Sequence, residues 1–174
     1  KERLLLNMIQ RMSGVSSLTG KYVEKLNNNK IKVLDTRKTT PGLRMFEKYA
    51  VFCGGGSNHR LNLSSGIMVK DNHINKITDE VADKLTRISP SVPIQFEVDS
   101  PKQINSQNVS LVDAFLLDNM TPNKIKKCIE KINLLKNKDK KIFIEVSGGV
   151  TLKNISKFNL KGVNGISVGA LTHQ

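Results

Sequence analysis

Apolar and polar positions follow two patterns along this chain, one typical of helices and one typical of short buried strands. Apolar residues first recur every three or four positions, which predicts a leading helix over residues 2–27, broken near Gly14. Beyond it, short β-rich runs alternate with helical segments. The predicted strands cover residues 31–35, 66–70, 93–98, 112–117, 142–146 and 165–168, and the predicted helices cover 42–52, 76–88, 101–107, 122–136 and 151–158.

This alternation determines the expected fold class. Repeated strand-helix units require parallel strands with right-handed crossovers, in either an open doubly wound sheet or a barrel. Polar residues follow strand after strand, and only a barrel gathers all those strand ends on one face. We therefore predict an α/β fold, an incomplete (open), TIM-like parallel β/α barrel of about six strands. Residues 1–28 would form a leading helical segment of a single domain over 1–174.

The net charge of +13 at pH 7 raises nucleic acid as a partner, because clustered Lys and Arg release counterions from phosphates. However, 22 of the 28 basic residues are Lys, and they scatter through Asn-rich stretches such as 121–141. The chain also has no Trp and only two Tyr on which bases could stack. We therefore expect no nucleic-acid partner.

Several other classes of protein are disfavoured by what the sequence lacks. Its longest apolar stretches, such as 111–117, are far shorter than a bilayer span, and the N-terminus lacks the pattern of a signal peptide. Cys53 and Cys128 show neither a CxxC pair nor a histidine at ligand spacing. We expect a cytoplasmic protein with no membrane partner, no disulfide, no zinc and no organic cofactor.

Two cations stand directly after the first predicted strand. The segment DTRKTTPG, residues 35–42, places Arg37 and Lys38 there, followed by hydroxyls and a Pro-Gly that can start a helix. Cations at the end of a buried strand need anionic partners or solvent, because an unpaired buried charge is costly. Anion binding and a structural ion pair with a neighbouring carboxylate are both open interpretations.

Two further motifs add cations to the same predicted face. In CGGGSNHR, residues 53–60, three glycines permit close approach of the backbone before His59 and Arg60. An isolated His59 would be a satisfied loop histidine, but next to the planar fork of Arg60 it indicates a carboxylate clamp. The segment VKDNH places Lys70 at a strand end, and its next three residues are turn and capping residues.

Carboxylates and glycines complete the set. Glu97 in FEVDS and Asp118 in FLLDNM suit Mg²⁺ or a ribose hydroxyl, or else they neutralise nearby cations. The segments EVSGGV (145–150) and ISVGAL (166–171) supply small residues at the last two strand ends, where barrels usually hold phosphate, although glycines also serve tight turns. Together these motifs predict a site for a small polyanion joined to a phosphosugar.

The motifs, in their order, resemble those of the quinolinate phosphoribosyltransferases, in the C-terminal barrel portion of that enzyme. The matching segments are ERLLLNMIQRMSGVSS, LDTRKTTPGLRMFEKYAVFCGGGSNHRL, VKDNHI, FEVDS, LLDNM, EVSGGV and ISVGAL. The resemblance covers nearly the whole chain. It implies phosphoribosyl transfer from phosphoribosyl pyrophosphate to quinolinate with decarboxylation, giving nicotinate mononucleotide for NAD biosynthesis. It also implies a homodimer or a higher homo-oligomer.

The resemblance implies a role for each candidate residue. Quinolinate would be bound by Arg37, Lys38, His59, Arg60 and Lys70, with Arg3 added from a neighbouring subunit. The catalytic residues would be Lys38, acting on the departing pyrophosphate, and Glu97 and Asp118, acting around the ribose and around Mg²⁺, directly or through water. The 5′-phosphate would be held by Ser147, Gly148, Gly149 and Gly169.

The chain also departs from the family pattern. We expect this chain to lack the N-terminal α/β sandwich domain and the helical tail of the family. Residues 64–66 (Ser-Ser-Gly) replace bulkier residues that usually include an acid. These departures leave two alternatives open. One is a truncated, non-catalytic remnant of the family, and the other is a related phosphoribosyltransferase that uses another pyridine carboxylate such as nicotinate.

Overall fold

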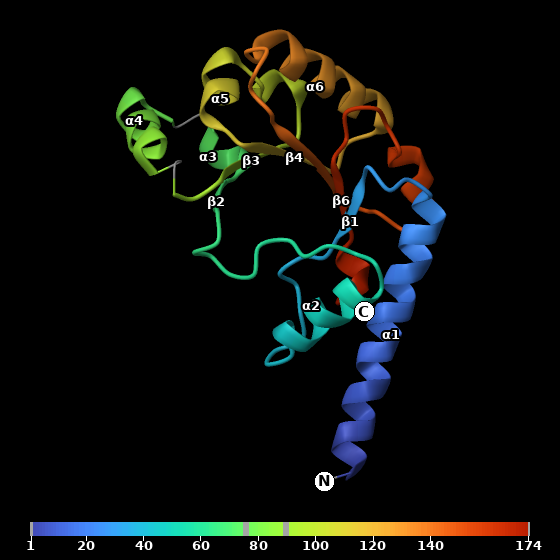
Figure 1. The fold of residues 1–174 in the computed structure, drawn as a ribbon. Helices are drawn as coiled ribbons and strands as arrows, with labels where there is room; N and C mark the ends of the chain where they lie inside the picture. The colour runs from blue at the N-terminus through green and yellow to red at the C-terminus, as the bar shows by residue number, and fades with distance from the viewer. Residues whose placement is uncertain (1, 75–76, 89–90, 174) are drawn as a thin grey trace.

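A single curved sheet organises the computed structural model, which describes residues 2–74, 77–88 and 91–173. The strands are β1 (Lys32–Leu34), β2 (Ile67–Val69), β3 (Ile94–Val98), β4 (Ala114–Asp118), β5 (Phe143–Ser147) and β6 (Gly165–Ser167). They pair in parallel in the order β1-β6-β5-β4-β3-β2. Figure 1 shows the strands as an arc with α4, α5 and α6 outside it. The predicted open, incomplete β/α barrel is confirmed.

The helices follow the predicted order with shifted boundaries. They are α1 (Glu2–Leu26), α2 (Arg44–Cys53), α3 (Asp71–Ile74), α4 (Asp79–Ile88), α5 (Ser106–Leu111) and α6 (Pro122–Leu135), with 3₁₀ turns η1 (Pro101–Gln103), η2 (Ile155–Phe158) and η3 (Gly169–Leu171). No helix within the described ranges is both long and apolar enough to cross a membrane.

Several sequence predictions of local structure were wrong. Gly14 does not break α1, because the helix packs along α2, and this contact offsets the roughly 1 kcal/mol cost of a helical glycine. The predicted helix 101–107 is divided between η1 and α5, and 151–158 contains only the turn η2. The predicted turn residues after Lys70 form the short helix α3. The next helix, α4, begins at Asp79, whereas the sequence predicted its start at residue 76. Residue 76 lies outside the described residues.

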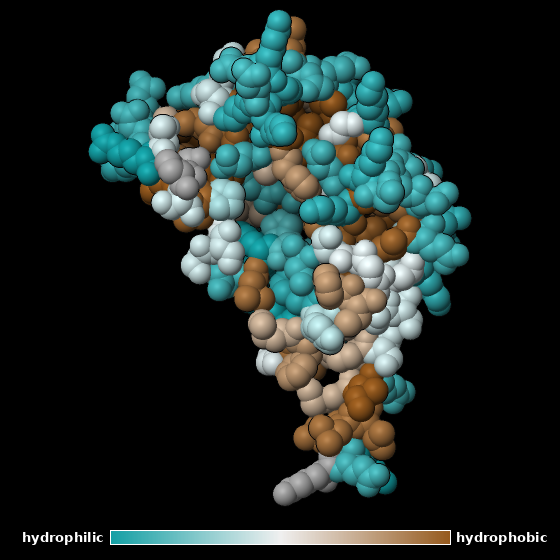
Figure 2. Space-filling view, viewed as in Figure 1, coloured by the Kyte–Doolittle hydropathy of each residue, from teal (hydrophilic) through white to brown (hydrophobic). Residues whose placement is uncertain are grey.

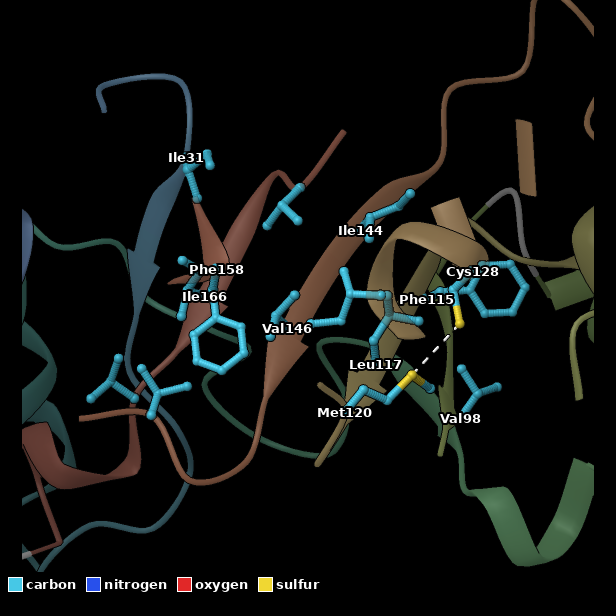
Figure 3. Close-up of a cluster of buried hydrophobic side chains, with 14 of the residues drawn as sticks. Ile31, Val98, Phe115, Leu117, Met120, Cys128, Ile144, Val146, Phe158 and Ile166 are labelled. Carbon is cyan, nitrogen blue, oxygen red and sulfur yellow. Dashed lines mark hydrogen bonds between the residues drawn. The ribbon is translucent and has the colours of Figure 1, made fainter. Parts of the chain in front are cut away.

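The apolar core lies between the outer face of the sheet and the helices. Strand residues alternate between the two faces, and the outward set includes Phe115, Leu117, Ile144, Val146 and Ile166, all buried. Figure 3 shows these side chains together with Met120 and with Cys128, which belongs to α6. The predicted apolar face of α6 is confirmed, since its three isoleucines at 125, 129 and 132 are buried.

The inner face of the sheet carries polar groups among apolar ones. Ala114, Leu116 and Phe143 point inward, and the polar inward positions carry amide, carboxylate and hydroxyl groups: Gln95, Glu97, Asp118, Glu145, Ser147 and Ser167. Buried polar groups are costly unless they are hydrogen-bonded, so this pattern marks the barrel interior as a place for chemistry.

The segment that follows α2 crosses the open side of the barrel, between β1 and β2 (Figure 1). Ser57 pairs with Leu34 there, and its N–H donates to the carbonyl of Val33 at 2.8 Å. The preceding glycines allow the segment to press against α1. A Cβ on Gly54 would lie 2.7 Å from the Cβ of Thr19, and one on Gly56 would lie 2.8 Å from the Cγ2 of Thr19. The close approach that these two glycines permit is therefore to a helix.

Candidate active site

A cavity of about 680 Å³ opens at the carboxyl ends of the strands. It collects nearly every residue that the sequence predicted for the site: Arg37, Lys38, His59, Arg60, Lys70, Glu97, Asp118, Ser147, Gly148, Gly149 and Gly169. These residues come from strand ends and loops spread over more than 130 positions of the chain, and the barrel brings them to one face because parallel strands all end there.

Arg3 is the exception, because it lies in the first turn of α1 and is not among the residues that line the cavity. In Figure 1 this end of α1 projects away from the barrel. Arg3 is exposed there. Within one chain Arg3 and the cavity are separate, so a contribution of Arg3 to a neighbouring subunit stays a prediction.

The loop that carries Arg37 and Lys38 is held through its backbone. The carbonyl of Arg37 accepts from Arg44 Nη2 at 3.3 Å, and the carbonyl of Lys38 accepts from Thr172 Oγ1 at 2.7 Å. No ion pair joins either side chain to a carboxylate among the residues described. The structural ion pair considered from the sequence is therefore not formed, and both cations face the cavity.

Arg60 is held next to Arg37. Its Nη1 donates to the carbonyl of Gly66 at 2.7 Å, and its Nη2 contacts Met68 Sδ at 3.6 Å. Burial lowers the pKa of Arg60 below its usual range, and the like charge of Arg37 lowers it further, while Glu145 opposes both. Two neighbouring, partly desolvated guanidiniums repel each other, and this repulsion is relieved when an anion binds between them.

His59 is more constrained than the sequence indicated. Its Nδ1 accepts the backbone N–H of Arg60 at 2.8 Å, and its Nε2 donates to Glu145 Oε2 at 3.1 Å. Both ring nitrogens therefore have protein partners, as in the satisfied loop histidine that the sequence left open. The ring still lines the cavity, and its part in binding a carboxylate stays a prediction.

A buried ion pair between Asp35 and Lys48 holds the main chain of the loop that carries His59. Asp35 Oδ1 accepts from Lys48 Nζ at 2.7 Å and from the backbone N–H of His59 at 2.7 Å, while Lys48 Nζ also donates to the carbonyl of His59 at 3.1 Å. The two charged side chains are almost completely buried. Burial raises the pKa of Asp35, although the hydrogen bonds from Lys48 and His59 oppose that rise. The pair thus fixes the main chain of His59 on both sides.

Glu97 of β3 and Asp118 of β4 lie on the inner face of neighbouring strands, where the register partner of Glu97 is Leu116. Burial raises the pKa of Glu97; Lys70 opposes this rise, and the negative charges of Asp118, Asp71 and Glu145 add to it. No cluster of three or more His, Cys, Asp or Glu side chains that could hold a metal exists among the described residues. Glu97 and Asp118 line the cavity and are carboxylates that could take part in holding a cation.

The glycines after β5 form a turn that only glycine can make. Gly148 has φ +91°, and a Cβ there would lie 2.7 Å from the backbone nitrogen of Asn119. Asn119 in turn donates its N–H to the carbonyl of Ser147 at 3.0 Å. A Cβ on Gly149 or Gly169 would meet no atom within 4 Å. The open space at these two glycines, at the carboxyl ends of β5 and β6, suits a phosphate.

Sequence reasoning missed four residues that shape the site: Glu145, Asp35, Lys48 and His173. Glu145 and His173 line the cavity, and the other two support it. For Glu145 a signal existed, since a single carboxylate in the apolar run IFIEV predicts a buried charge that needs partners. Nothing in the spacing of Asp35 and Lys48, which belong to different elements, predicts that they pair.

With this geometry established, comparison with known proteins identifies what the chain is similar to. Residues 15–174 match the family model described as "Quinolinate phosphoribosyl transferase, C-terminal domain". The chain is 41% identical to the probable nicotinate-nucleotide pyrophosphorylase (carboxylating) of Bacillus subtilis strain 168, over 99% of the chain and 58% of that protein. It is 37% identical to the nicotinate-nucleotide pyrophosphorylase (carboxylating) of Mycobacterium leprae, over 99% of the chain and 60% of that protein.

Solved structures agree with these matches. The crystal structure of NadC from Streptococcus pyogenes superposes with a TM-score of 0.86 at 41% identity, over 99% of this chain and 59% of that one. The nicotinate-nucleotide pyrophosphorylase of Francisella tularensis gives a TM-score of 0.86 at 35% identity, over 99% and 60% respectively. The chain thus spans less than two thirds of the length of these four relatives.

Proposed function

The chain belongs to the quinolinate phosphoribosyl transferase family, and from this premise we propose that it carries the active site for transfer of phosphoribosyl from phosphoribosyl pyrophosphate to quinolinate. The products would be nicotinate mononucleotide, pyrophosphate and carbon dioxide. The observation that carries the proposal is the pair of neighbouring guanidiniums, Arg37 and Arg60, which form no ion pair among the described residues and line a cavity that the glycine turn after β5 also lines. The two guanidiniums suit a dicarboxylate, and the glycine turn suits a sugar phosphate.

Quinolinate would lie over the cationic end of the cavity. Arg37 and Arg60 each offer a planar pair of N–H donors to a carboxylate, and Lys38 and Lys70 add point charges at the rim. His59 reaches the same surface, and Arg3 would come from a neighbouring subunit. A substrate with a single carboxylate would leave part of this positive charge unmatched, so the site favours quinolinate over nicotinate.

Phosphoribosyl pyrophosphate would occupy the opposite end of the cavity. Its 5′-phosphate fits the space left at Gly149 and Gly169, with Ser147 and Gly148 forming the turn. Glu97 and Asp118 would hold the ribose hydroxyls and Mg²⁺, directly or through water. Bound with the substrate, Mg²⁺ would neutralise charge on the pyrophosphate.

The reaction needs orientation more than a strong acid or base. The pyridine nitrogen of quinolinate forms a bond to the anomeric carbon of ribose as the bond from that carbon to pyrophosphate breaks. Lys38 would stabilise the departing pyrophosphate, and Glu97 and Asp118 would stabilise the positive charge that develops on the ribose. The bond to the 2-carboxylate then breaks, carbon dioxide leaves, the positive ring nitrogen stabilises the electron pair left on C2, and C2 takes up a proton.

A direct assay tests this proposal. The protein is incubated with phosphoribosyl pyrophosphate, Mg²⁺ and quinolinate labelled in its 2-carboxylate. We expect one labelled carbon dioxide for each nicotinate mononucleotide, and no mononucleotide when nicotinate replaces quinolinate. Mononucleotide formed from nicotinate would instead support a related phosphoribosyltransferase, and absence of product from either acid would support a non-catalytic remnant. The free cysteines suit the reducing cytoplasm in which we propose that the reaction occurs.

We further propose that two copies associate through α1 and α2. Apolar side chains lie 49% to 68% exposed along these two helices: Leu4, Leu5, Leu6, Ile9, Met45, Phe46, Tyr49 and Phe52. Figure 2 shows brown, apolar atoms gathered over the free end of α1. Exposed apolar side chains gathered in this number on two adjacent helices are typical of an interface. It would also place Arg3 of one copy against another copy.

Charges placed in this apolar surface should separate the copies. The double variant Leu5→Glu, Ile9→Glu is expected to sediment as a monomer at micromolar concentration, while the unaltered protein sediments as a dimer or larger, because a buried unpaired carboxylate costs several kcal/mol. Leu134→Glu is the control, since Leu134 is an 83% exposed apolar residue on α6, outside the surface. A monomeric unaltered protein in sedimentation equilibrium contradicts the proposal.

A further inference from the structure

We propose that Glu145 is a positioning residue which, acting through the imidazole of His59, fixes Arg60 in the orientation that meets a substrate carboxylate. This inference rests on the proposed function, because it takes Arg60 as a ligand of quinolinate. It adds a residue that holds the carboxylate clamp without touching the substrate. Three residues form the link: Glu145 on β5 contacts His59, and His59 contacts Arg60 in the segment that follows α2.

The carboxylate of Glu145 is already saturated by protein donors. Its side chain is 2% exposed. Oε2 accepts from His59 Nε2 at 3.1 Å and from Gln95 Nε2 at 2.7 Å, and Oε1 accepts from the hydroxyl of Ser167. With both oxygens occupied, Glu145 is poorly placed to bind a cation or to take a proton from a substrate. What it can do is hold its donors in place.

Glu145 remains an acceptor at neutral pH. Burial by itself would raise the pKa of this carboxyl, but the hydrogen bonds from His59, Ser167 and Gln95 outweigh burial and bring the pKa below its usual range. A buried carboxylate that accepts several N–H and O–H groups is held in its ionised form in this way.

His59 links Glu145 to Arg60 through the two nitrogens of its ring. Because its Nε2 faces a carboxylate and its Nδ1 accepts the N–H of Arg60 at 2.8 Å, the ring needs its hydrogen on Nε2 alone. Asp35 and Lys48 hold the main chain of His59 at the same time. The ring therefore has one orientation and one tautomer, and through Nδ1 it aims the backbone of the next residue.

Arg60 needs this constraint because it has room to turn away. A second cavity of about 370 Å³ lies on the other side of the barrel interior, and His59, Arg60 and Glu145 line both cavities. Neighbouring Arg37 also repels the guanidinium. Without the link from Glu145 through His59, the second cavity offers the Arg60 side chain a place away from the substrate, and the clamp loses one of its two guanidiniums.

Kinetics of two Glu145 variants test the proposal. Glu145→Ala is expected to raise KM for quinolinate about tenfold to a hundredfold with kcat changed less than about threefold, the range for loss of a hydrogen bond to a charged group. Glu145→Gln keeps an oxygen for His59 and Gln95 and can donate to Ser167, so KM should stay within about threefold. Gln95→Met is the matched control, because it removes the other donor to Oε2 and leaves His59 bound. Equal KM for Glu145→Ala and the unaltered protein overturns the proposal.

A second measurement separates positioning from general loss of structure. In a His59→Phe background, Glu145→Ala should change KM by less than about twofold further, because the path to Arg60 is already broken. Full additivity of the two changes overturns the proposal. Thermal unfolding of each variant, measured in parallel, shows whether it is folded at the assay temperature, and Glu145→Gln supplies the comparison if Glu145→Ala is not.

The tautomer of His59 can be read without any turnover. In the free protein with ¹⁵N-labelled histidine, Nε2 should carry the hydrogen and Nδ1 should give the shift of an acceptor nitrogen. This pattern should persist in Glu145→Gln and be lost in Glu145→Ala. A His59 ring with hydrogen on Nδ1 in the unaltered protein overturns the proposal. If the tautomers behave as expected but quinolinate is not a substrate, the proposed function fails while the link from Glu145 to His59 stands.

Discussion

Replacement of Lys48 by methionine is expected to lower the free energy of unfolding by about 3–5 kcal/mol, the range for removal of one partner from a buried ion pair. The variant leaves the carboxylate of Asp35, which is fully buried, without its cation. The backbone N–H of His59 would remain as a donor to Asp35 but cannot neutralise its charge. Unfolding in urea at pH 8, followed by circular dichroism, measures the change.

A matched control comes from an exposed ion pair of nearly the same length. Lys84 Nζ lies 2.6 Å from Glu80 on α4, against 2.7 Å for Lys48 and Asp35, but its side chain is 67% exposed. Lys84→Met should therefore cost less than about 1 kcal/mol. If both variants lose the same small amount, the interior at Asp35 is wetter than the structure indicates, and the buried pair is not what orders the loop.

The pH dependence of the free energy of unfolding of Lys48→Met tests whether folding raises the pKa of Asp35. A carboxyl whose pKa is raised on folding contributes stability below its unfolded pKa, near 3.9, and loses it as the pH rises through its folded pKa. Removing Lys48 removes an influence that lowers the pKa of Asp35, so that pKa rises further. The loss in free energy of unfolding, relative to the unaltered protein, should therefore be smaller at pH 5 than at pH 8. Equal losses at the two pH values would contradict the raised pKa of Asp35.

The buried pair also shows which parts of the site could be predicted from the sequence. Arg37, Lys70 and Asp118 could be placed, because residues that follow the strands of a parallel barrel must meet on one face whatever their spacing. The partners of Asp35 could not be placed. Pairing with Lys48 depends on how α2 packs against β1, and that geometry is decided by tertiary contacts that no local pattern records.

The glycines show the same difference between what could and what could not be predicted from the sequence. A glycine turn after β5 was expected from its place in the chain, and the positive φ of Gly148 explains why glycine stands there. The run at 54–56 was interpreted as a means of close approach in the same way, but two of its glycines make room for Thr19 of α1. Sequence alone shows that a backbone must come close to something, and only the fold shows whether that is a ligand or a helix.

Arg37→Ala is expected to have the opposite profile to Lys48→Met, with a large loss of binding and almost no loss of stability. KM for quinolinate should rise about thirtyfold or more, because a desolvated guanidinium that pairs with a carboxylate contributes at least 2 kcal/mol and often more. KM for phosphoribosyl pyrophosphate should change less than about threefold. Arg37→Lys should recover only part of the loss, since it restores the charge without the two-pronged donor.

The stability of the same variant separates a binding residue from a structural one. Within the described residues Arg37 forms no ion pair, and it repels Arg60, so its removal from the free protein should leave the unfolding temperature unchanged or slightly higher. Differential scanning calorimetry without substrate measures this. Quinolinate should then raise the unfolding temperature of the unaltered protein but not that of the variant. A destabilised variant that still binds quinolinate as tightly would make Arg37 structural and remove the main support for the proposed clamp.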